Sequence, residues 1–289
     1  MHWRTLVISS CARLEFECGN IIIISDETSI YPICEIKTLV ISSQQVSITC
    51  YLLNELVFHN VKVIFCDDRR TPSFELCKYY GNTISSEQLF KQTNWHELLK
   101  SHKWQQIVIQ KLNMQYKLLC HYNFPNRNKL KYLSEQVELD DRTNREGYGA
   151  KLYFNSLFGN DFTRESSCTE NAGLNYGYTI LLSMFNRSIA IHGYNTALGI
   201  HHCNKYNHFN LSCDLMEPFR PFVDKIVYEN RHRELDREYK MLFISLEYQK
   251  MIYDGKKYEI GTAVDKYVKE LLDNMNDTSY KIKEMDFIA

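Results

Sequence analysis

Two carboxylates and a group of imidazoles near residue 210 are the side chains of this sequence best suited to chemistry. Asp214 and Glu217 stand three residues apart, and Arg220 follows three residues later. Three residues are close to one helical turn, so both acids would project from one helix face. Three histidines precede them, at His201, His202 and His208. Acids and imidazoles that converge in this way can hold a divalent metal ion.

The same residues also have purely structural interpretations. The Asp214-x-x-Glu217 spacing fits a helix-capping pattern, and Pro218 suits a first helical turn. Arg220 could pair with Glu217 or with Asp224. The histidines lie in a polar segment rich in asparagine, where solvated imidazoles are common. A metal site and a set of helix caps therefore both remain open at this point.

Glu146 is a third acid in a position that calls for a partner. The segment Thr143–Glu146 opens a predicted helix, and Ala150, Tyr153 and Leu157 share one side of it with Glu146. Thr143-x-x-Glu146 also fits a capping box, in which the acid would simply stabilise the helix start. A carboxylate on an apolar helix face needs a partner, and a metal ion is one such partner.

Together, these side chains form a mixed set of oxygen and nitrogen donors without thiolate. Such a set suits Mg²⁺ or Mn²⁺ better than a structural zinc ion. A metal held in this way can bind a phosphodiester and activate a hydroxyl group. The sequence contains no phosphate-binding Gly-x-x-x-x-Gly-Lys loop, no Gly-x-Gly-x-x-Gly and no Gly-x-Ser-x-Gly. The residues thus favour a metal-dependent phosphodiester enzyme over a nucleotide-dependent enzyme or a serine hydrolase.

Composition excludes several classes of protein. The 289 residues include 34 basic and 35 acidic side chains, so global charge gives no indication of nucleic-acid binding. The ten cysteines form no Cys-x-x-Cys and sit mostly in apolar runs, as free thiols do in a reducing compartment. No signal-peptide pattern is present, and no apolar run approaches the roughly 20 residues that cross a bilayer. We expect a cytoplasmic protein with no membrane partner.

The order of secondary structure predicts an α+β protein with two domains. Short strands dominate the first 80 residues, including a hairpin at Gly19-Asn20 and strands at Ile36–Ile41 and Val61–Phe65. One helix, around Leu52 to Val57, interrupts them. Long helical patterns replace the strands after Gly81-Asn82. We expect a small β-sandwich-like domain over residues 1–83 and a larger, mostly α-helical domain over residues 84–289.

Three finer expectations concern the helical domain. One helix should begin at Ser85 or Ser86 and extend through Trp104, with a second helix from Ile107 to Cys120. Gly173 and Gly177 lie four residues apart on a later helix, which would let another backbone approach closely. The polar tail after Asn276 is expected to be loose.

Four motifs follow one another along the second part of the chain. They are Asn144-Arg-Glu-Gly147 with Tyr153-Phe154-Asn155 and Leu157-Phe158-Gly159, then Asn171-Ala-Gly-Leu-Asn-Tyr-Gly-Tyr178, Gly199-Ile-His-His202, and Ser212-Cys-Asp-Leu-Met-Glu-Pro-Phe-Arg-Pro221. Each motif by itself is weak, but four in order are specific. They resemble a known family, the CRISPR-associated integrase and endonuclease of the adaptation module, called here the "Cas-one" family. The resemblance runs from Trp3-Arg4 to about Asn230, and Ile64-Phe-Cys-Asp-Asp68 is most similar to the type II-A branch.

The resemblance implies a catalytic set and a metal. Its pattern places the ligands of Mg²⁺ or Mn²⁺ at Glu146, His202 and Glu217, with Asp214 as an auxiliary catalytic acid. Several members of the family place the last ligand at an aspartate, which leaves the division of roles between Asp214 and Glu217 open. Three arginines flank the motifs and could contact DNA phosphates or form ordinary surface ion pairs: Arg145, Arg164 and Arg220.

The resemblance also implies an activity and partners. The protein would insert short captured DNA fragments into a CRISPR repeat array by transesterification, in which a 3′-hydroxyl attacks a repeat-boundary phosphodiester. The N-terminal β-rich domain would form a homodimer, and two homodimers would clamp the small "Cas-two" adaptation protein. An effector nuclease and a DNA-end-binding accessory protein of a type II-A system could join them.

Two other functions remain compatible with the residues. The first is a stand-alone metal-dependent nuclease that acts on branched or damaged DNA, with water as the nucleophile. The second is a DNA-binding scaffold without catalytic activity, in which the acids serve as helix caps. Covalent joining of DNA would distinguish the integrase from both.

Overall fold

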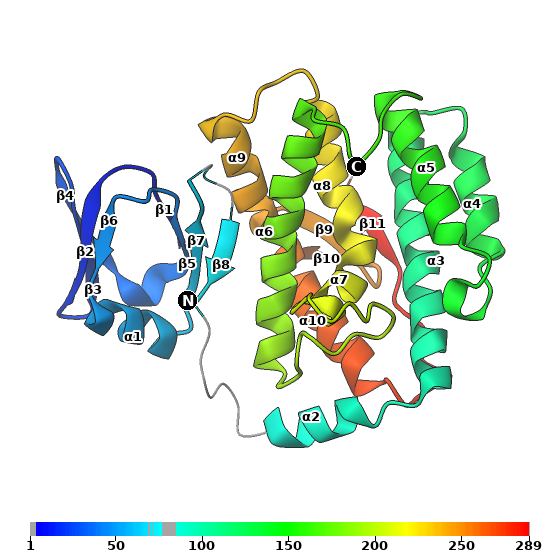
Figure 1. The fold of residues 1–289 in the computed structure, drawn as a ribbon, viewed down its shortest axis with the longest axis horizontal. Helices are drawn as coiled ribbons and strands as arrows, with labels where there is room; N and C mark the ends of the chain where they lie inside the picture. Colours follow the sequence, from blue (N-terminus) through cyan, green and yellow to red (C-terminus); the bar gives the residue numbers. More distant parts are fainter. Residues whose placement is uncertain (1–3, 69, 71, 77–84, 289) are drawn as a thin grey trace. The chain divides into compact units, whose positions relative to one another are not determined.

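A computed structural model describes residues 4–68, 70, 72–76 and 85–288 of the chain. The chain divides into two compact units, Met1–Tyr80 and Gly81–Ala289. The first is rich in strands and the second is mostly helical, which confirms the predicted fold class (Figure 1). The predicted domain boundary at residue 83 falls within residues 77–84, which lie outside the described residues. We describe each unit by itself.

Two four-stranded sheets, one α-helix and a short 3₁₀ turn, η1 (Ile33–Glu35), build the described part of the N-terminal unit. The first sheet has the order β1-β5-β7-β8; its first three strands are parallel, and the last is antiparallel. Its strands are β1 (Arg4–Ile8), β5 (Ile36–Ile41), β7 (Lys62–Cys66) and β8 (Pro72–Glu75). The second sheet has the order β4-β3-β2-β6, formed by β4 (Thr28–Pro32), β3 (Asn20–Ile24), β2 (Ala12–Glu17) and β6 (Val46–Ile48).

Both sheets and α1 (Cys50–Phe58) contribute to one hydrophobic core. Leu14 and Ile21 come from the second sheet, Leu39 from the first, and Leu52 from the helix, and all four are fully buried. Along a strand, successive side chains point to opposite faces of the sheet. The core residues of each strand therefore come from the one face that is turned toward α1 and the other sheet. The helix begins where the Thr49 hydroxyl accepts a hydrogen bond from the Leu52 backbone N–H.

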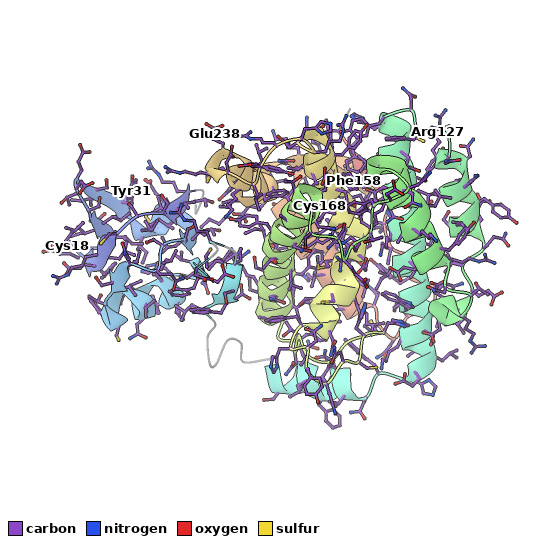
Figure 2. The ribbon with its side chains drawn as sticks, turned by 45° about the horizontal axis from the view of Figure 1, so that its top comes forward. Cys18, Tyr31, Arg127, Phe158, Cys168 and Glu238 are labelled. Carbon is purple, nitrogen blue, oxygen red and sulfur yellow. The ribbon has the colours of Figure 1, made fainter. Side chains whose placement is uncertain are left out.

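The hairpin predicted between β2 and β3 is present, but its turn lies one residue earlier. Glu17 pairs with Asn20, so the two turn residues are Cys18 and Gly19 rather than Gly19 and Asn20. Both turn residues have positive φ, 49° and 79°, as a type I′ hairpin turn requires. Figure 2 labels Cys18 in this turn.

The helical unit contains nine α-helices in its described part, together with a small antiparallel sheet of order β10-β9-β11. The strands are β9 (Lys250–Tyr253), β10 (Lys256–Glu259) and β11 (Met285–Phe287). The helices are α2 (Ser85–Thr93), α3 (Glu97–His121), α4 (Arg127–Glu135), α5 (Arg145–Phe158), α6 (Thr169–Ile191), α7 (Asn210–Met216), α8 (Arg220–Glu229), α9 (Arg237–Ile244) and α10 (Ile260–Asp273), with short 3₁₀ turns η2 (Leu139–Asp141), η3 (Glu217–Phe219) and η4 (Ser245–Tyr248).

The long helix α3 organises this unit. It packs against α4, α5, α8, η3 and β11, and Figure 1 shows it running beside α5 and α4. The predicted break between Trp104 and Ile107 is wrong, because α3 continues through it for 25 residues. The chain breaks earlier, where the His96 side chain accepts a hydrogen bond from the Leu98 backbone N–H and begins α3. The apolar side chains from Leu98 to Cys120, which were divided between two predicted helices, lie on α3 alone.

The tail after Asn276 was expected to be loose, and this prediction is wrong. Its end forms β11, which pairs with β9, and Met285 is fully buried. Two lysines of α3 hold the tail as well: Lys103 Nζ donates to the Asp277 carbonyl at 2.6 Å, and Lys117 Nζ donates to the Met285 carbonyl at 2.6 Å. A mostly polar segment can form this strand, because only its alternate residues, Met285 and Phe287, are buried.

Helix α6 is closely covered by α8 and α9, and its two glycines make room for side chains rather than for a backbone. A Cβ at Gly177 would lie 2.4 Å from Val223 Cγ1 and 2.7 Å from Phe243 Cδ1. A Cβ at Gly173 would lie 2.9 Å from the Tyr239 hydroxyl. The helix is thus fixed against α8 and α9, and α8 directly follows the segment that carries Asp214 and Glu217. In the described part of the chain, no helix is long and apolar enough to cross a membrane.

Candidate functional site

Two of the predicted acids meet at a lysine that the sequence reading did not consider. Lys111 lies in the middle of α3, and its Nζ contacts both Glu146 Oε1 and Glu217 Oε2, the second at 2.5 Å. Glu146 comes from the first turn of α5 and Glu217 begins η3. Three separate elements therefore converge on one ammonium group. The Lys111 and Glu217 side chains are 7% and 6% exposed, while that of Glu146 is 31% exposed.

Glu146 does not serve as a capping-box residue. The N-cap of α5 is Asn144, whose side chain accepts a hydrogen bond from the Gly147 backbone N–H. The backbone N–H groups of Arg145 and Glu146 donate to the Asp141 carboxylate at 2.8 and 2.9 Å. Because these groups satisfy the helix start, the Glu146 carboxylate is free to face α3.

Glu217 is held between two cations. Arg220 Nε lies 2.9 Å from Glu217 Oε1, on the other side of the carboxylate from Lys111. Burial by itself would raise the pKa of Glu217, but Arg220 and Lys111 outweigh it and lower the pKa. For the same reason the pKa of Lys111 is raised: its burial opposes the charge, and Glu217 and Glu146 overcome that cost. Glu217, Lys111 and Arg220 are therefore ionised at neutral pH.

Asp214 takes a different position from Glu217, although both come from the same motif. It is fully buried in α7, and its carboxylate accepts backbone N–H groups from three consecutive residues, Ile200, His201 and His202. Its Oδ1 also lies 2.5 Å from His202 Nδ1. Asp214 therefore shapes the loop that presents His202, and neither acid accepts a capping bond at the start of α7, η3 or α8.

Gly199 allows this loop to fold onto Asp214. A Cβ at Gly199 would lie 2.3 Å from the His202 carbonyl oxygen and 2.8 Å from Asp214 Oδ2. Any larger residue would push the loop away from the carboxylate that holds it. The Gly-Ile-His-His spacing is thus a packing requirement of the loop.

The two adjacent histidines point to different partners. His201 stacks on Trp104 with ring centroids 4.3 Å apart and its Nδ1 lies 3.5 Å from Asp140. His202 faces Asp214, and its pKa is raised first by this hydrogen bond and also by Glu217 and Glu146, against the effect of burial. His202 is the histidine that belongs to the acidic cluster, and its Nε2 is the ring nitrogen left for a ligand.

A cavity of about 240 Å³ opens beside the carboxylate pair. Three acids and three cations line it: Glu146, Glu217, Asp224, Lys111, Arg164 and Arg220. Its charges therefore balance when every group is ionised. Its other lining residues are Gln115, Ala150, Phe154 and Tyr178.

Tyr178 and Asp224 form the wall of this cavity. The Arg220 and Arg164 guanidinium groups lie over the Tyr178 ring, 4.6 and 5.4 Å from its centroid. The Tyr178 and Tyr153 hydroxyls donate to the two oxygens of Asp224 at 2.5 and 2.9 Å. Burial raises the pKa of Asp224 to about 6, although these two hydrogen bonds act in the opposite direction. The network fixes both guanidinium groups at the cavity.

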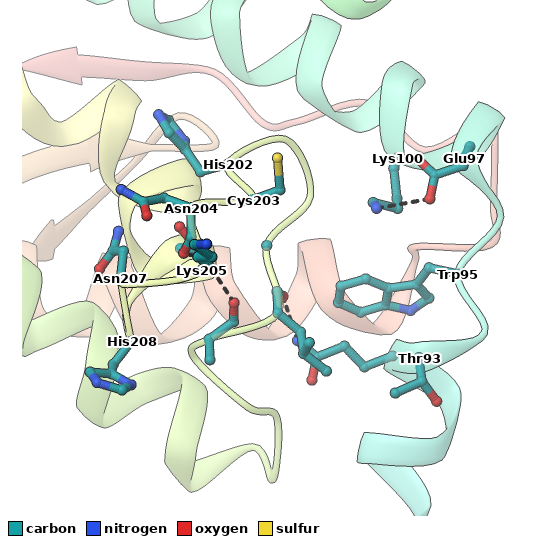
Figure 3. A pocket seen from close by; sticks show the side chains of 15 residues that line it. Thr93, Trp95, Glu97, Lys100, His202, Cys203, Asn204, Lys205, Asn207 and His208 are labelled. Carbon is teal, nitrogen blue, oxygen red and sulfur yellow. Dashed lines mark hydrogen bonds and ion pairs between the residues drawn. The ribbon is translucent and has the colours of Figure 1, made fainter.

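A second, larger cavity of about 460 Å³ lies on the His202 side of the loop. Figure 3 shows Trp95 and the Lys100–Glu97 pair on one side of it and His202 and Lys205 on the other. The buried Gln92 amide connects the two sides of this cavity. Gln92 Nε2 donates to the carbonyl oxygens at positions 195 and 198, at 2.8 and 2.7 Å, and thereby attaches α2 to the segment that leads into the His202 loop.

Of the three arginines predicted to contact phosphate, two reach the cavity. Arg220 and Arg164 line it, but Arg164 also donates to the side-chain oxygens of Asn171 and Asn175. Arg145 lines neither cavity, because its helix turns Glu146 inward instead. Arg145 as a DNA contact stays a prediction with no support from the cavity geometry.

The donor set fits a hard divalent cation, although the ligands are not assembled around one position. Glu146 and Glu217 already share a cation, the Lys111 ammonium. His202 Nδ1 is bonded to Asp214. Among the described residues, no three His, Cys, Asp or Glu side chains form a group that could hold a metal ion. Binding by the predicted set would therefore require Lys111 to leave the two carboxylates.

Comparison with known proteins assigns the family. The family model described as CRISPR associated protein Cas1 matches residues 6–240, which include every predicted site residue. The chain belongs to the Cas1 family. A CRISPR-associated endonuclease Cas1 from Neisseria meningitidis serogroup C is 31% identical over 288 residues, covering 97% of this chain and 95% of the relative. The named relatives do not test the narrower resemblance to a type II-A branch, which stays a prediction.

Two solved structures share the Cas1 fold with this chain. A casposase bound to integration product has a TM-score of 0.75 at 19% identity and covers 98% of this chain and 92% of its own. A Cas6-RT-Cas1–Cas2 complex has a TM-score of 0.74 at 18% identity and covers 97% of this chain and 36% of that one. At these identities the likeness establishes the fold.

Sequence reasoning did not assign three residues to the site: Lys111, Asp224 and Tyr178. Lys111 carries the clearest signal, because it falls among the apolar positions of α3 beside Val108 and Leu112, and a charge there needs a buried partner. Asp224 shows the same signal on the apolar face of α8. Tyr178 could not be distinguished from an ordinary core residue of α6 by its spacing.

Proposed function

We propose that this chain is a metal-dependent DNA endonuclease and integrase that inserts short captured fragments into a CRISPR array. The observation that carries the proposal is the meeting of Glu146 and Glu217, from two elements 71 positions apart in sequence, at a single buried cation. Two carboxylates that share one cation form the core of a site for Mg²⁺ or Mn²⁺. Membership of the Cas1 family supports the CRISPR role.

The predicted ligands are Glu146, His202 and Glu217. Asp214 would act through His202, because its hydrogen bond fixes the ring and leaves Nε2 for the ligand position. A divalent cation bound there would supply a Lewis acid for a phosphodiester and favour ionisation of a hydroxyl group. Asp214 is thus a positioning residue rather than a ligand.

The other side chains of the cavity suit a phosphodiester substrate. Arg220 and Arg164 present guanidinium groups beside the carboxylate pair, and such groups bind phosphate oxygens. The Asp224–Tyr178 network holds these groups in place before substrate arrives. Preorganised positive charge of this kind stabilises the extra negative charge of a phosphoryl-transfer transition state.

The proposed reaction exchanges one phosphodiester bond for another. The 3′-oxygen of the captured fragment forms a bond to the phosphorus at the repeat boundary and loses its proton. The bond from that phosphorus to the 3′-oxygen of the repeat strand breaks, and the released oxygen takes up a proton. No water is consumed, and one such exchange on each strand completes insertion.

A joining assay tests the proposal. The protein would be incubated with Mn²⁺, a labelled short duplex that ends in a 3′-hydroxyl and a plasmid that carries a repeat. We expect covalent transfer of label to the plasmid, and none from a matched duplex with a 3′-dideoxy end. Plasmid cleavage without joining would support the stand-alone nuclease, with water as the nucleophile. DNA binding without either reaction would support the non-catalytic scaffold.

Partners form the second part of the proposal. The fold shared with a Cas6-RT-Cas1–Cas2 complex and a casposase bound to integration product supports DNA and the small Cas2 protein as partners. The homodimer through the N-terminal unit stays a prediction, as do the effector nuclease and the DNA-end-binding accessory protein. Light scattering of the purified chain alone would measure the homodimer, and light scattering of its mixture with Cas2 would measure the complex of the two proteins.

A further inference from the structure

Lys111 occupies the place where the proposed metal ion belongs. Its ammonium holds both Glu146 and Glu217 in a nearly solvent-free position, since its side chain is only 7% exposed. A buried ammonium is stable only with anionic or hydrogen-bonding partners. The metal ion would need the same two carboxylates. The two cations therefore compete for one pair of acids.

The charges around the cavity make joint occupancy unfavourable. The cavity lining contains three acids and three cations, so it is neutral without metal. A divalent cation added to this set would leave two uncompensated positive charges close to buried Lys111 and Arg220. Charges of one sign repel strongly where water is scarce.

The cavity offers the displaced ammonium only one other acid, and the oxygens of that acid are already hydrogen-bonded. Asp224 is the third acid of the lining, and Tyr178 and Tyr153 already donate to both of its oxygens. Gln115 lies one helical turn from Lys111 on α3, and its buried Oε1 has no hydrogen-bond partner in the described part of the protein. This oxygen can accept one hydrogen bond from the ammonium, but it brings no negative charge. Because the three acids and three cations of the lining already balance, the negative charge that compensates an added divalent cation has to come from outside the cavity.

We infer that Lys111 is an internal counter-ion that excludes the divalent cation until a phosphodiester ligand binds. This inference rests on the metal site of the proposed function. In the DNA-free protein, Lys111 keeps Glu146 and Glu217 together and blocks the metal. A DNA phosphate gives the ammonium a new partner and releases the carboxylates. Metal and DNA binding therefore strengthen one another, and the coupling is reciprocal.

Mn²⁺ binding measures this coupling without any turnover. Free Mn²⁺ would be followed by electron paramagnetic resonance during titration of the full chain, with and without a 3′-dideoxy duplex that cannot be joined. For the wild-type protein we expect at least about a tenfold gain in Mn²⁺ affinity when the duplex is present. For Lys111→Met we expect the DNA-free affinity to rise by at least about tenfold, and the duplex to add less than about threefold.

Two further variants separate the inference from general damage. Lys103→Met removes another buried ammonium of α3, one that donates to the Asp277 carbonyl instead of the carboxylate pair, and should leave Mn²⁺ affinity unchanged. Lys111→Arg keeps the charge and should retain weak DNA-free binding. Circular dichroism would establish that each variant is folded.

The outcomes distinguish the two proposals. Tight DNA-free Mn²⁺ binding by Lys111→Met supports the counter-ion role. If Lys111→Met binds Mn²⁺ no more tightly than the wild-type protein, while the wild type binds Mn²⁺ and joins DNA, the inference is overturned and the proposed function stands. If neither protein binds Mn²⁺ with or without duplex, both the metal site and the inference fail.

Discussion

We predict that Glu146 and Glu217, the two carboxylates that contact Lys111, contribute unequally to the free energy of folding. Replacing Glu217 by Gln removes one charge from a cluster in which Lys111 and Arg220 are both largely buried. Removing one partner of a buried ion pair costs about 3–5 kcal/mol of folding free energy. The Glu146 side chain is 31% exposed, so water screens the loss and Glu146→Gln should cost only about 1 kcal/mol.

Urea denaturation of each variant in EDTA at pH 7, followed by tryptophan fluorescence, would measure these costs without metal. Glu284→Gln is the matched control, because Glu284 pairs with Lys117 of the same helix but its side chain is 79% exposed. It should change the free energy of unfolding by less than about 0.5 kcal/mol. In the joining assay, both Glu146→Gln and Glu217→Gln should lose at least about 100-fold in rate, because each would remove a metal ligand.

Equal destabilisation by Glu146→Gln and Glu217→Gln would refute this reasoning, because the difference in burial would then have no energetic effect. A cost below about 1 kcal/mol for Glu217→Gln would refute it as well. Loss of stability without loss of joining would show that the acids act only in the fold.

Three further predictions follow from other parts of the helical unit. Gly177→Ala should lower the free energy of unfolding by about 1–3 kcal/mol, despite the better helix propensity of alanine, because its methyl group would meet Val223 and Phe243; thermal unfolding would measure this. Deletion of residues 277–289 should cost about 3 kcal/mol in urea denaturation, because β11 and its buried Met285 would be lost. The pKa of Asp224 is about 6 instead of 3.8, so the folded protein binds its proton more tightly than the unfolded chain does. The protonated Asp224 side chain therefore stabilises the folded protein below about pH 4, and this stabilisation is lost as pH rises through 6. Between these pH values, the free energy of unfolding of the wild type should fall by about 3 kcal/mol relative to that of Asp224→Asn. Urea denaturation at each pH would measure the difference.

Much of the fold could be predicted from local patterns. Alternating apolar residues in the first 80 positions predicted strands, and apolar residues at helical spacing predicted the helices that follow. The errors arose where a pattern was ambiguous. The stripe on α3 was divided into two helices, because periodicity does not say where a helix is interrupted. The tail after Asn276 was expected to be loose, because β11 is too short to show a pattern of its own.

The sequence by itself predicted the acids and the histidine of the site. Glu146 lies on an apolar helix face, and such a carboxylate must have a partner. Residue types and spacing indicated Asp214, Glu217 and the nearby histidines, the ordered motifs selected His202 among these, and the family model covers all of them. The sequence could not divide the roles of Asp214 and Glu217, because both lie on one short stretch with the same spacing as a cap.

Only the tertiary structure decided what these residues contact. In the folded chain, Glu217 forms ion pairs with Lys111 and Arg220, whereas Asp214 accepts hydrogen bonds from the backbone of the loop that leads to His202. Lys111 lies 35 positions before Glu146, and no local pattern specifies which helix will cover a given face. Periodicity fixes the side of a helix on which a charge lies, whereas packing of α3, α5 and η3 fixes the charge that it meets. The cation shared by the two carboxylates is therefore a property of the folded chain.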